Sequence, residues 1–222
     1  MVAAGMNNLR EFDSRQALHD ALSALICEQL EGGIKQRGTG RLIVSGGSTP
    51  IPLFHQLAKT TFDWQNVSVC LADERLVPAD HPRCNASMVQ QELLQEKAAA
   101  AAFLSLSEAA QTWDTKPFAD ITLLGMGNDG HTASLFPDAP ELKSALNGDQ
   151  PVYTMTPPSQ PEARETFGLQ TLCASQQLVL HIEGEEKYRV LQEAMNDSAT
   201  TSLPIRTLIE AAHSHITIFW AP

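Results

Sequence analysis

The residues best suited to chemistry lie in one stretch, residues 125–137, which reads Gly-Met-Gly-Asn-Asp-Gly-His-Thr-Ala-Ser-Leu-Phe-Pro. It follows the apolar run Ile121–Leu124, which predicts a buried parallel strand, so the glycines begin at the carboxyl end of that strand. Ligands of open α/β sheets bind at such ends. The loop offers the Asp129 carboxylate and the His131 imidazole, and an imidazole in water titrates near pH ~6.5 and accepts a proton at neutral pH. The alternative is a tight turn with a structural histidine.

A second glycine-rich stretch, Gly46-Gly47-Ser48-Thr49-Pro50, lies between a predicted strand and a predicted helix. Backbone N–H groups at a helix start, the helix dipole and two hydroxyls together form an anion site. The stretch lacks the Gly-Lys-Ser/Thr of a Walker A loop and the G-x-G-x-x-G of a dinucleotide-binding turn. The alternative is a simple helix cap, with Thr49 as the cap and Pro50 as the first helical residue.

The stretch 125–137 resembles the signature of the 6-phosphogluconolactonases and is close to that of their relatives, the glucosamine-6-phosphate deaminases. Ser45–Pro50 is similar to the Ser-Gly-Gly-Ser-Thr-Pro of both families, which cradles the sugar phosphate there. Three further segments resemble the lactonase pattern: Asp73-Glu74-Arg75 with Leu76-Val77-Pro78 and His81, Arg164-Glu165-Thr166 after Pro161, and Gly184-Glu185-Glu186-Lys187. The resemblance thus spans most of the chain. One departure is Cys84, which stands where the family has a small hydroxyl residue.

The resemblance assigns roles to residues that would otherwise be interpreted as surface charge. It implies that Arg164 and Lys187 close on the phosphate, that Arg75 contacts the substrate and that Asp73 faces the sugar. The substrate-binding residues that it implies are Gly46, Gly47, Ser48, Thr49, Gly127, Arg164 and Lys187. The catalytic residues that it implies are His131, Asp129, Asp73 and Arg75.

The activity that the resemblance implies is hydrolysis of 6-phospho-D-glucono-1,5-lactone to 6-phosphogluconate, in the oxidative branch of the pentose phosphate pathway. His131 is the expected general base that activates water, and Asp129 either orients it or holds hydroxyls of the lactone. We expect no covalent nucleophile, because no Gly-x-Ser-x-Gly elbow is present. We expect no cofactor and no metal, because the carboxylates and histidines lack a ligand spacing such as H-E-x-x-H.

Two other functions are compatible with parts of the pattern. An amino-sugar-phosphate deaminase or isomerase carries a Glu as partner of its His, and here Phe136 occupies that place. A non-catalytic sugar-phosphate sensor would not need both Asp129 and His131, and no DNA-binding segment is attached. The lactonase is therefore the favoured hypothesis.

Composition limits the partners of this chain. Its 222 residues carry a net charge of −11 at pH 7, which argues against binding to nucleic acid or an anionic membrane, because both need a basic face. A phosphorylated substrate must then be held by a local cationic cluster. The four cysteines are scattered, which predicts free thiols in a cytoplasmic protein. We expect one domain over residues 1–222, acting as a monomer on a small-molecule sugar-phosphate lactone.

The elements that must position these residues alternate between strands and helices. We expect an α/β fold of three α/β/α layers around a mostly parallel, Rossmann-like sheet. The resemblance implies the deaminase and ribose-5-phosphate isomerase type of this fold. The predicted strands are 41–45, 67–72, 103–106, 121–124, 152–156, 167–172, 177–182 and 215–219. The predicted helices start after Ser14 and end at Gly32-Gly33, then cover 51–58, 85–94, 141–146, 185–195 and the segment from Pro204 to Ala212.

Overall fold

The computed structural model describes residues 8–196 and 203–222, and its centre is a seven-stranded sheet. The strands lie in the order β1-β10-β9-β6-β2-β3-β5, and every neighbouring pair is parallel. They are β1 Leu9–Glu11, β2 Gly40–Val44, β3 Val67–Leu71, β5 Ala102–Leu104, β6 Ile121–Leu124, β9 Gln177–Glu183 and β10 Ile216–Ala221. All residues of β2 and β6 are buried, as expected of central strands with both faces covered.

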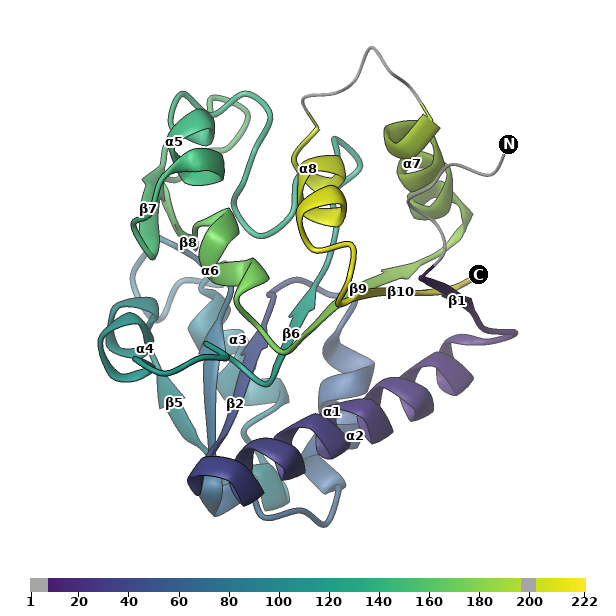
Figure 1. Ribbon diagram of the computed structural model, residues 1–222, viewed down its shortest axis with the longest axis vertical. Coiled ribbons are helices and arrows are strands. Elements are labelled where there is room, and N and C mark those ends of the chain that lie inside the picture. The colour runs from purple at the N-terminus through teal and green to yellow at the C-terminus, as the bar shows by residue number, and fades with distance from the viewer. Residues whose placement is uncertain (1–7, 197–202) are drawn as a thin grey trace.

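Helices cover both faces of this sheet. Figure 1 shows α1 and α2 along one face and α6, α7 and α8 along the other. The helices are α1 Arg15–Arg37, α2 Ile51–Lys59, α3 Asn85–Glu92, α4 Leu106–Thr112, α5 Leu142–Asn147, α6 Leu169–Cys173, α7 Glu185–Asn196 and α8 Pro204–Ala211. Two 3₁₀ turns, η1 Trp64–Asn66 and η2 Glu96–Ala100, complete the set. The prediction of an α/β fold with a mostly parallel sheet is confirmed. No helix of the described segments is long and apolar enough to cross a bilayer.

A second, antiparallel sheet of three strands stands beside the first. It contains β4 Asp73–Arg75, β8 Arg164–Phe167 and β7 Val152–Met155, in that order. Its register places Arg75 directly opposite Arg164. Because β4 begins only two residues after β3 ends, the small sheet starts at the carboxyl edge of the large one.

Two of the predicted elements differ from the structure because tertiary contacts outweigh local signals. The first helix does not end at Gly32-Gly33 but runs to Arg37 and ends at Gly38, which has a φ of +81°. Gly33 lies where the helix crosses Asp120, and a Cβ there would lie 2.2 Å from that carboxylate. The predicted strand 167–172 is instead the end of β8 followed by α6, since a short apolar run does not by itself distinguish strand from helix.

The predicted helix cap at Thr49 is wrong, and neither helix that starts beside the candidate site is capped by a hydroxyl side chain. Helix α2 begins at Ile51 with Pro50 at the cap position and has no side-chain cap from Thr49. Helix α3 begins at Asn85, and its cap is Cys84, whose Sγ accepts a hydrogen bond from the Ser87 backbone N–H at 3.5 Å. The cysteine therefore takes the capping role that a hydroxyl residue performs at helix starts.

Candidate active site

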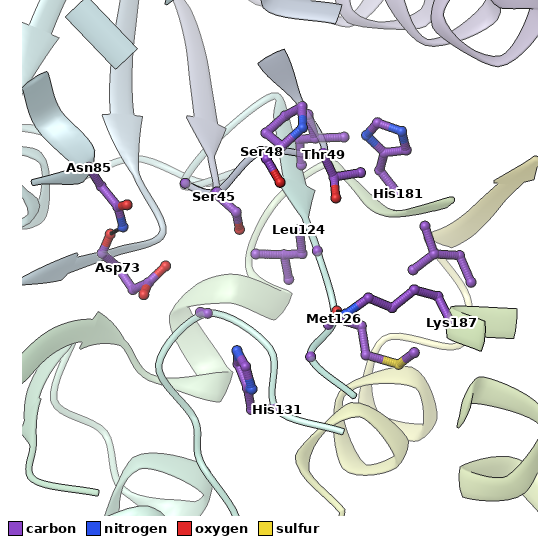
Figure 2. Close-up of a pocket in the computed structure, with 18 of the residues that line it drawn as sticks. Ser45, Ser48, Thr49, Asp73, Asn85, Leu124, Met126, His131, His181 and Lys187 are labelled. Atoms are coloured by element: carbon purple, nitrogen blue, oxygen red, sulfur yellow. Dashed lines mark hydrogen bonds between the residues drawn. The ribbon is translucent and has the colours of Figure 1, made fainter. Parts of the chain in front are cut away.

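The candidate site lies at the carboxyl ends of four adjacent strands, β3, β2, β6 and β9, where a cavity of about 280 Å³ opens (Figure 2). Strands β2 and β6 are neighbours, but the chain continues from β2 outward to β3 and from β6 outward to β9. Their following loops diverge at this switch point and leave a crevice, which is where open α/β sheets bind ligands.

All the residues predicted for the site line this cavity except Asp129, whose carboxylate contacts the His131 ring instead. Those that line it are Gly46, Gly47, Ser48, Thr49, Asp73, Arg75, Gly127, His131, Arg164 and Lys187. The Gly46–Thr49 loop and the His131 imidazole therefore face one cavity on the same side of the sheet (Figure 2).

His131 is held by a hydrogen bond and by a ring contact. Its Nδ1 lies 2.5 Å from Asp129 Oδ1, and its ring stacks on buried Phe136 with centroids 4.1 Å apart and planes 25° apart. Partial burial works to raise the pKa of the Asp129 carboxyl, but the hydrogen bond and charge of His131 hold that pKa below its usual range. The ionised carboxylate keeps the proton on Nδ1, so Nε2 is the nitrogen able to accept one.

Gly127 makes the contact between Asp129 and His131 possible. A Cβ at Gly127 would lie 2.1 Å from His131 Nδ1 and 2.5 Å from Asp129 Oδ1, closer than real Cβ atoms approach. The Gly127 backbone N–H also donates to the His131 carbonyl at 2.9 Å, which closes the turn. A side chain at this position would displace the pair.

Asp73 is a buried carboxylate at the cavity wall, with 5% of its surface exposed. The Ser134 hydroxyl donates to its Oδ2 at 2.6 Å, and Arg164 Nη1 lies 4.0 Å from the same oxygen. Burial raises the pKa of the Asp73 carboxyl, and the Ser134 hydrogen bond and Arg164 oppose that shift. Arg164 also lies over the Phe136 ring, 5.0 Å from its centroid.

The neighbours of Asp73 on β4 alternate in direction, as strand residues do. Arg75 lines the cavity and donates from Nη1 to the Arg83 carbonyl at 2.8 Å. Glu74 accepts hydrogen bonds from the backbone N–H groups of Asn85 at 2.8 Å and Ala86 at 2.6 Å. Glu74 therefore fixes the start of α3 and does not line the cavity.

The glycine-rich loop after β2 and Lys187 form another part of the wall (Figure 2). No hydrogen bond within residues 8–196 and 203–222 engages the hydroxyls of Ser48 and Thr49. Lys187 Nζ donates to the Met126 carbonyl at 2.5 Å. Burial lowers the pKa of the Lys187 ammonium, and the charges of Asp129 and Glu186 oppose that shift.

The charge of the cavity wall differs from that of the whole chain. Three cationic side chains, Arg75, Arg164 and Lys187, line it together with two carboxylates, Asp73 and Glu183. A wall with this excess of positive groups can hold an anion although the chain carries a net charge of −11.

Four polar residues line the cavity that the sequence interpretation missed: Ser45, Asn85, His181 and Glu183. The Asn85 amide donates to the Asp73 carbonyl at 3.1 Å, and its Oδ1 fills the space that a Gly46 Cβ would occupy, 2.1 Å away. His181 and Glu183 are two residues apart at the end of β9, and such alternate polar residues at a strand's carboxyl end were a readable signal.

Comparison with known proteins places this geometry in context. The family model described as glucosamine-6-phosphate isomerases/6-phosphogluconolactonase matches residues 13–220. The 6-phosphogluconolactonase of Rhizobium meliloti (strain 1021) is 39% identical over 229 aligned residues, which cover 97% of this chain and 99% of the relative.

Solved structures similar to this chain include a 6-phosphogluconolactonase and a glucosamine-6-phosphate deaminase. The crystal structure of a 6-phosphogluconolactonase from Shewanella baltica OS155 is 35% identical, with a TM-score of 0.89, and the match covers 96% of this chain and 97% of the other. A monomeric glucosamine-6-phosphate deaminase of the NagB superfamily shares the fold at 18% identity and a TM-score of 0.75, over 96% of this chain and 97% of the other.

Proposed function

The chain belongs to the family of glucosamine-6-phosphate isomerases and 6-phosphogluconolactonases, and from that membership we propose that it hydrolyses 6-phospho-D-glucono-1,5-lactone to 6-phosphogluconate. The observation that carries the proposal is the His131 imidazole, which lines one cavity with the Gly46–Thr49 loop and is bonded through Nδ1 to Asp129. A proton acceptor and an anion-binding loop thus face the same small volume.

In the proposed reaction His131 acts as a general base. Its Nε2 takes a proton from a water molecule, and the water oxygen forms a bond to the lactone carbonyl carbon. The Asp129 carboxylate stabilises the imidazolium that results, because it already accepts the Nδ1 hydrogen at 2.5 Å. When the tetrahedral intermediate collapses, the bond to the ring oxygen breaks and the imidazolium returns its proton to that oxygen. The product is an open-chain acid with a new hydroxyl, and no covalent intermediate on the protein is required.

The phosphate of the substrate is proposed to lie against the Gly46–Thr49 loop, with Arg164 and Lys187 as its cationic partners. Each charge-assisted hydrogen bond contributes about 1.5–3 kcal/mol, so two of them outweigh the diffuse repulsion from the rest of the chain. Asp73, buried beside Ser134, is the proposed acceptor of hydrogen bonds from sugar hydroxyls.

The developing oxyanion needs a donor, and one such donor contributes about 3–4 kcal/mol. Arg75 and the backbone N–H groups near Gly47 and Gly127 are the candidates, because all three residues line the cavity.

Phe136 favours a lactonase over a deaminase in this family. The deaminase pattern has a carboxylate at this position as a partner for its histidine, whereas here a buried aromatic ring stacks on His131. A ring cannot relay a proton. The competing activity is therefore tested by offering glucosamine-6-phosphate to the same preparation, and release of ammonia from it would favour the deaminase.

The direct test is a His131→Ala variant assayed on the lactone. We expect turnover to fall by at least about a hundredfold, the usual contribution of a general base, while 6-phosphogluconate still binds. His213, which is exposed and far along the sequence in the last loop, supplies the control variant His213→Ala. Unchanged turnover in His131→Ala would show that His131 is not the general base.

The phosphate role has its own test in the binding of 6-phosphogluconate. Arg164→Ala and Lys187→Ala should each weaken binding by roughly tenfold to a hundredfold, which corresponds to the loss of one charge-assisted hydrogen bond. Lys143→Ala, on the exposed surface of α5, is the matched loss of a positive charge outside the cavity. Equal affinities in all three variants would contradict the assignment.

A further inference from the structure

A cluster of two histidines and one glutamate lies at the edge of the candidate site, and the proposed reaction does not use it. His19 of α1 meets His181 and Glu183 of β9, and one ligand atom from each lies within 4.8 Å of the other two. Within the described segments this is the one group of at least three such side chains with this spacing. We call these three residues the His-Glu-His cluster.

The fold holds the cluster together in the protein interior. His181 and Glu183 are two apart on β9 and so project from the same face of the strand, toward α1. His19 is 4% exposed and His181 is 2% exposed, and their rings meet edge to face with centroids 5.7 Å apart. Neither imidazole can turn away without leaving a cavity, so the three side chains are preorganised.

Both histidine Nε2 atoms already contact the same oxygen of Glu183. Glu183 Oε1 lies 2.8 Å from His19 Nε2 and 2.9 Å from His181 Nε2. A tetrahedral Zn²⁺ ion with bonds of about 2.0–2.2 Å holds its ligand atoms about 3.4 Å apart. Moving each nitrogen about half an ångström away from Glu183 Oε1 therefore brings these two separations to the value that the ion needs.

We propose that the His-Glu-His cluster is a binding site for a transition-metal cation of the Zn²⁺ class. Two imidazole nitrogens and one carboxylate oxygen are a ligand set that Zn²⁺ uses in sites that keep an open position. Binding of the ion through Nε2 requires each imidazole to carry its hydrogen on Nδ1.

The protonation states of the cluster suit a metal ligand set. Partial burial works to raise the pKa of the Glu183 carboxyl, but the hydrogen bonds from His181 and His19 hold it at about 2, so the carboxylate is ionised at neutral pH. Burial lowers the pKa of His181, which keeps that imidazole neutral. Metal ions bind the deprotonated forms of these groups.

One cation contacts the cluster, and a second lines the same cavity. Arg15 of α1 lies 3.3 Å from Glu183 Oε2 and donates to the Pro222 carbonyl at 3.0 Å, so it engages the oxygen that the ion does not use. Lys187 of α7 lines the same cavity and is bonded to the Met126 carbonyl. Arg15 thereby orients the carboxylate as an outer-shell partner, at the cost of some repulsion with the ion.

The open coordination position would face the candidate active site, because His181 and Glu183 both line the cavity. A water or an anionic oxygen of a molecule in the cavity completes the four ligands there. The site does not depend on the proposed lactonase activity, so the two proposals can fail separately.

The experiment measures Zn²⁺ binding to protein treated with chelator and desalted, by titration calorimetry, and Co²⁺ binding by visible absorption. We expect one equivalent of Zn²⁺ with a Kd below about 10 µM. His19→Gln and His181→Gln should each weaken binding by about a hundredfold or more, because removal of an outer-shell partner alone costs 10–100-fold. His213→Gln, the loss of an exposed imidazole elsewhere, should bind like the unaltered protein.

A second measurement on the unaltered protein covers the case in which a buried histidine variant does not fold. Zn²⁺ should shift the side-chain ¹⁵N resonances of His19 and His181 and leave those of His213 unchanged. Inorganic phosphate added to the Co²⁺ form should change its absorption bands, since its oxygen can occupy the open position. The proposal is overturned if no Zn²⁺ binds, if binding survives in both folded variants, or if only other histidines shift.

Discussion

The contact between Asp129 and His131 gives the sharpest test of the proposed reaction. Replacing Asp129 with Asn keeps the size of the side chain and an oxygen that accepts the Nδ1 hydrogen, but removes the negative charge. The charge matters most when His131 becomes an imidazolium, which happens once it has taken the proton from water. The change should therefore act on the chemical step and leave substrate binding alone, since Asp129 does not line the cavity.

The size of the effect follows from the geometry of the pair. The Nδ1–Oδ1 contact of 2.5 Å joins an imidazole N–H to an ionised carboxylate, and hydrogen bonds to charged groups contribute about 1.5–3 kcal/mol. The Asp129 side chain is 45% exposed, so solvent screens the charge and the lower end of that range applies. A loss of about 1.5–2 kcal/mol corresponds to a fall in kcat of roughly ten- to thirtyfold with KM unchanged.

Initial rates can be followed by the acid that lactone opening releases, after subtraction of the uncatalysed rate. Asp149→Asn, on an exposed loop and without a hydrogen-bonding side-chain partner in the described parts of the chain, is the matched charge loss. A kcat within twofold of the unaltered enzyme would refute the orienting role of Asp129. A raised KM with unchanged kcat would instead assign Asp129 to the lactone hydroxyls, the other role that its position in the sequence allows.

Three further predictions test the surroundings of the site. Phe136→Leu should lower kcat by roughly two- to tenfold through loss of the stacking that holds His131, and a rise in KM alone would contradict this. Glu183→Gln should lower the free energy of unfolding by about 3 kcal/mol at pH 7, because the depressed pKa of the Glu183 carboxyl stabilises the folded protein above pH 4.5. That stabilisation is lost as pH falls from 4.5 toward 2. Urea titrations should therefore show the difference between the two proteins shrinking over this pH range, and a constant difference would be inconsistent with the argument. Gly33→Ala should lower the free energy of unfolding, measured by urea titration, by about 1–3 kcal/mol, because the new Cβ would lie 2.2 Å from the Asp120 carboxylate. Helix propensity alone predicts that alanine stabilises the helix, so a more stable variant would disprove the clash.

The sequence carried enough information for the fold class and for the position of most of the site. Each predicted loop follows a strand whose apolar, β-branched residues mark it as buried, as in Ile121–Leu124. Parallel strands send their carboxyl ends to one edge, so loops far apart in the chain converge without any further information.

What the sequence could not supply was contact between elements. Gly33 has the appearance of a helix stop, and only the approach of Asp120 explains a glycine inside α1. The stacking of Phe136 on His131 likewise depends on how the loop folds back on itself. His19 lies on an apolar helix face more than 160 residues from Glu183, and no local pattern connects them. Helix α4, by contrast, could have been predicted, because Ser105 and Glu108 have the spacing of a capping box. That signal was not used in predicting the helices.

The register of the small sheet has a consequence for how the protein responds to salts. Arg75 and Arg164 stand directly opposite each other on β4 and β8, and like charges in such pairs repel, as the lowering of the Arg164 pKa by burial and by neighbouring Arg75 also indicates. An anion bound between the two guanidinium groups would remove that repulsion and so tighten the strand pair itself. Phosphate or sulfate at millimolar concentration should then raise the melting temperature more than chloride of equal ionic strength does, which makes a simple thermal-shift series a reporter of ligand occupancy.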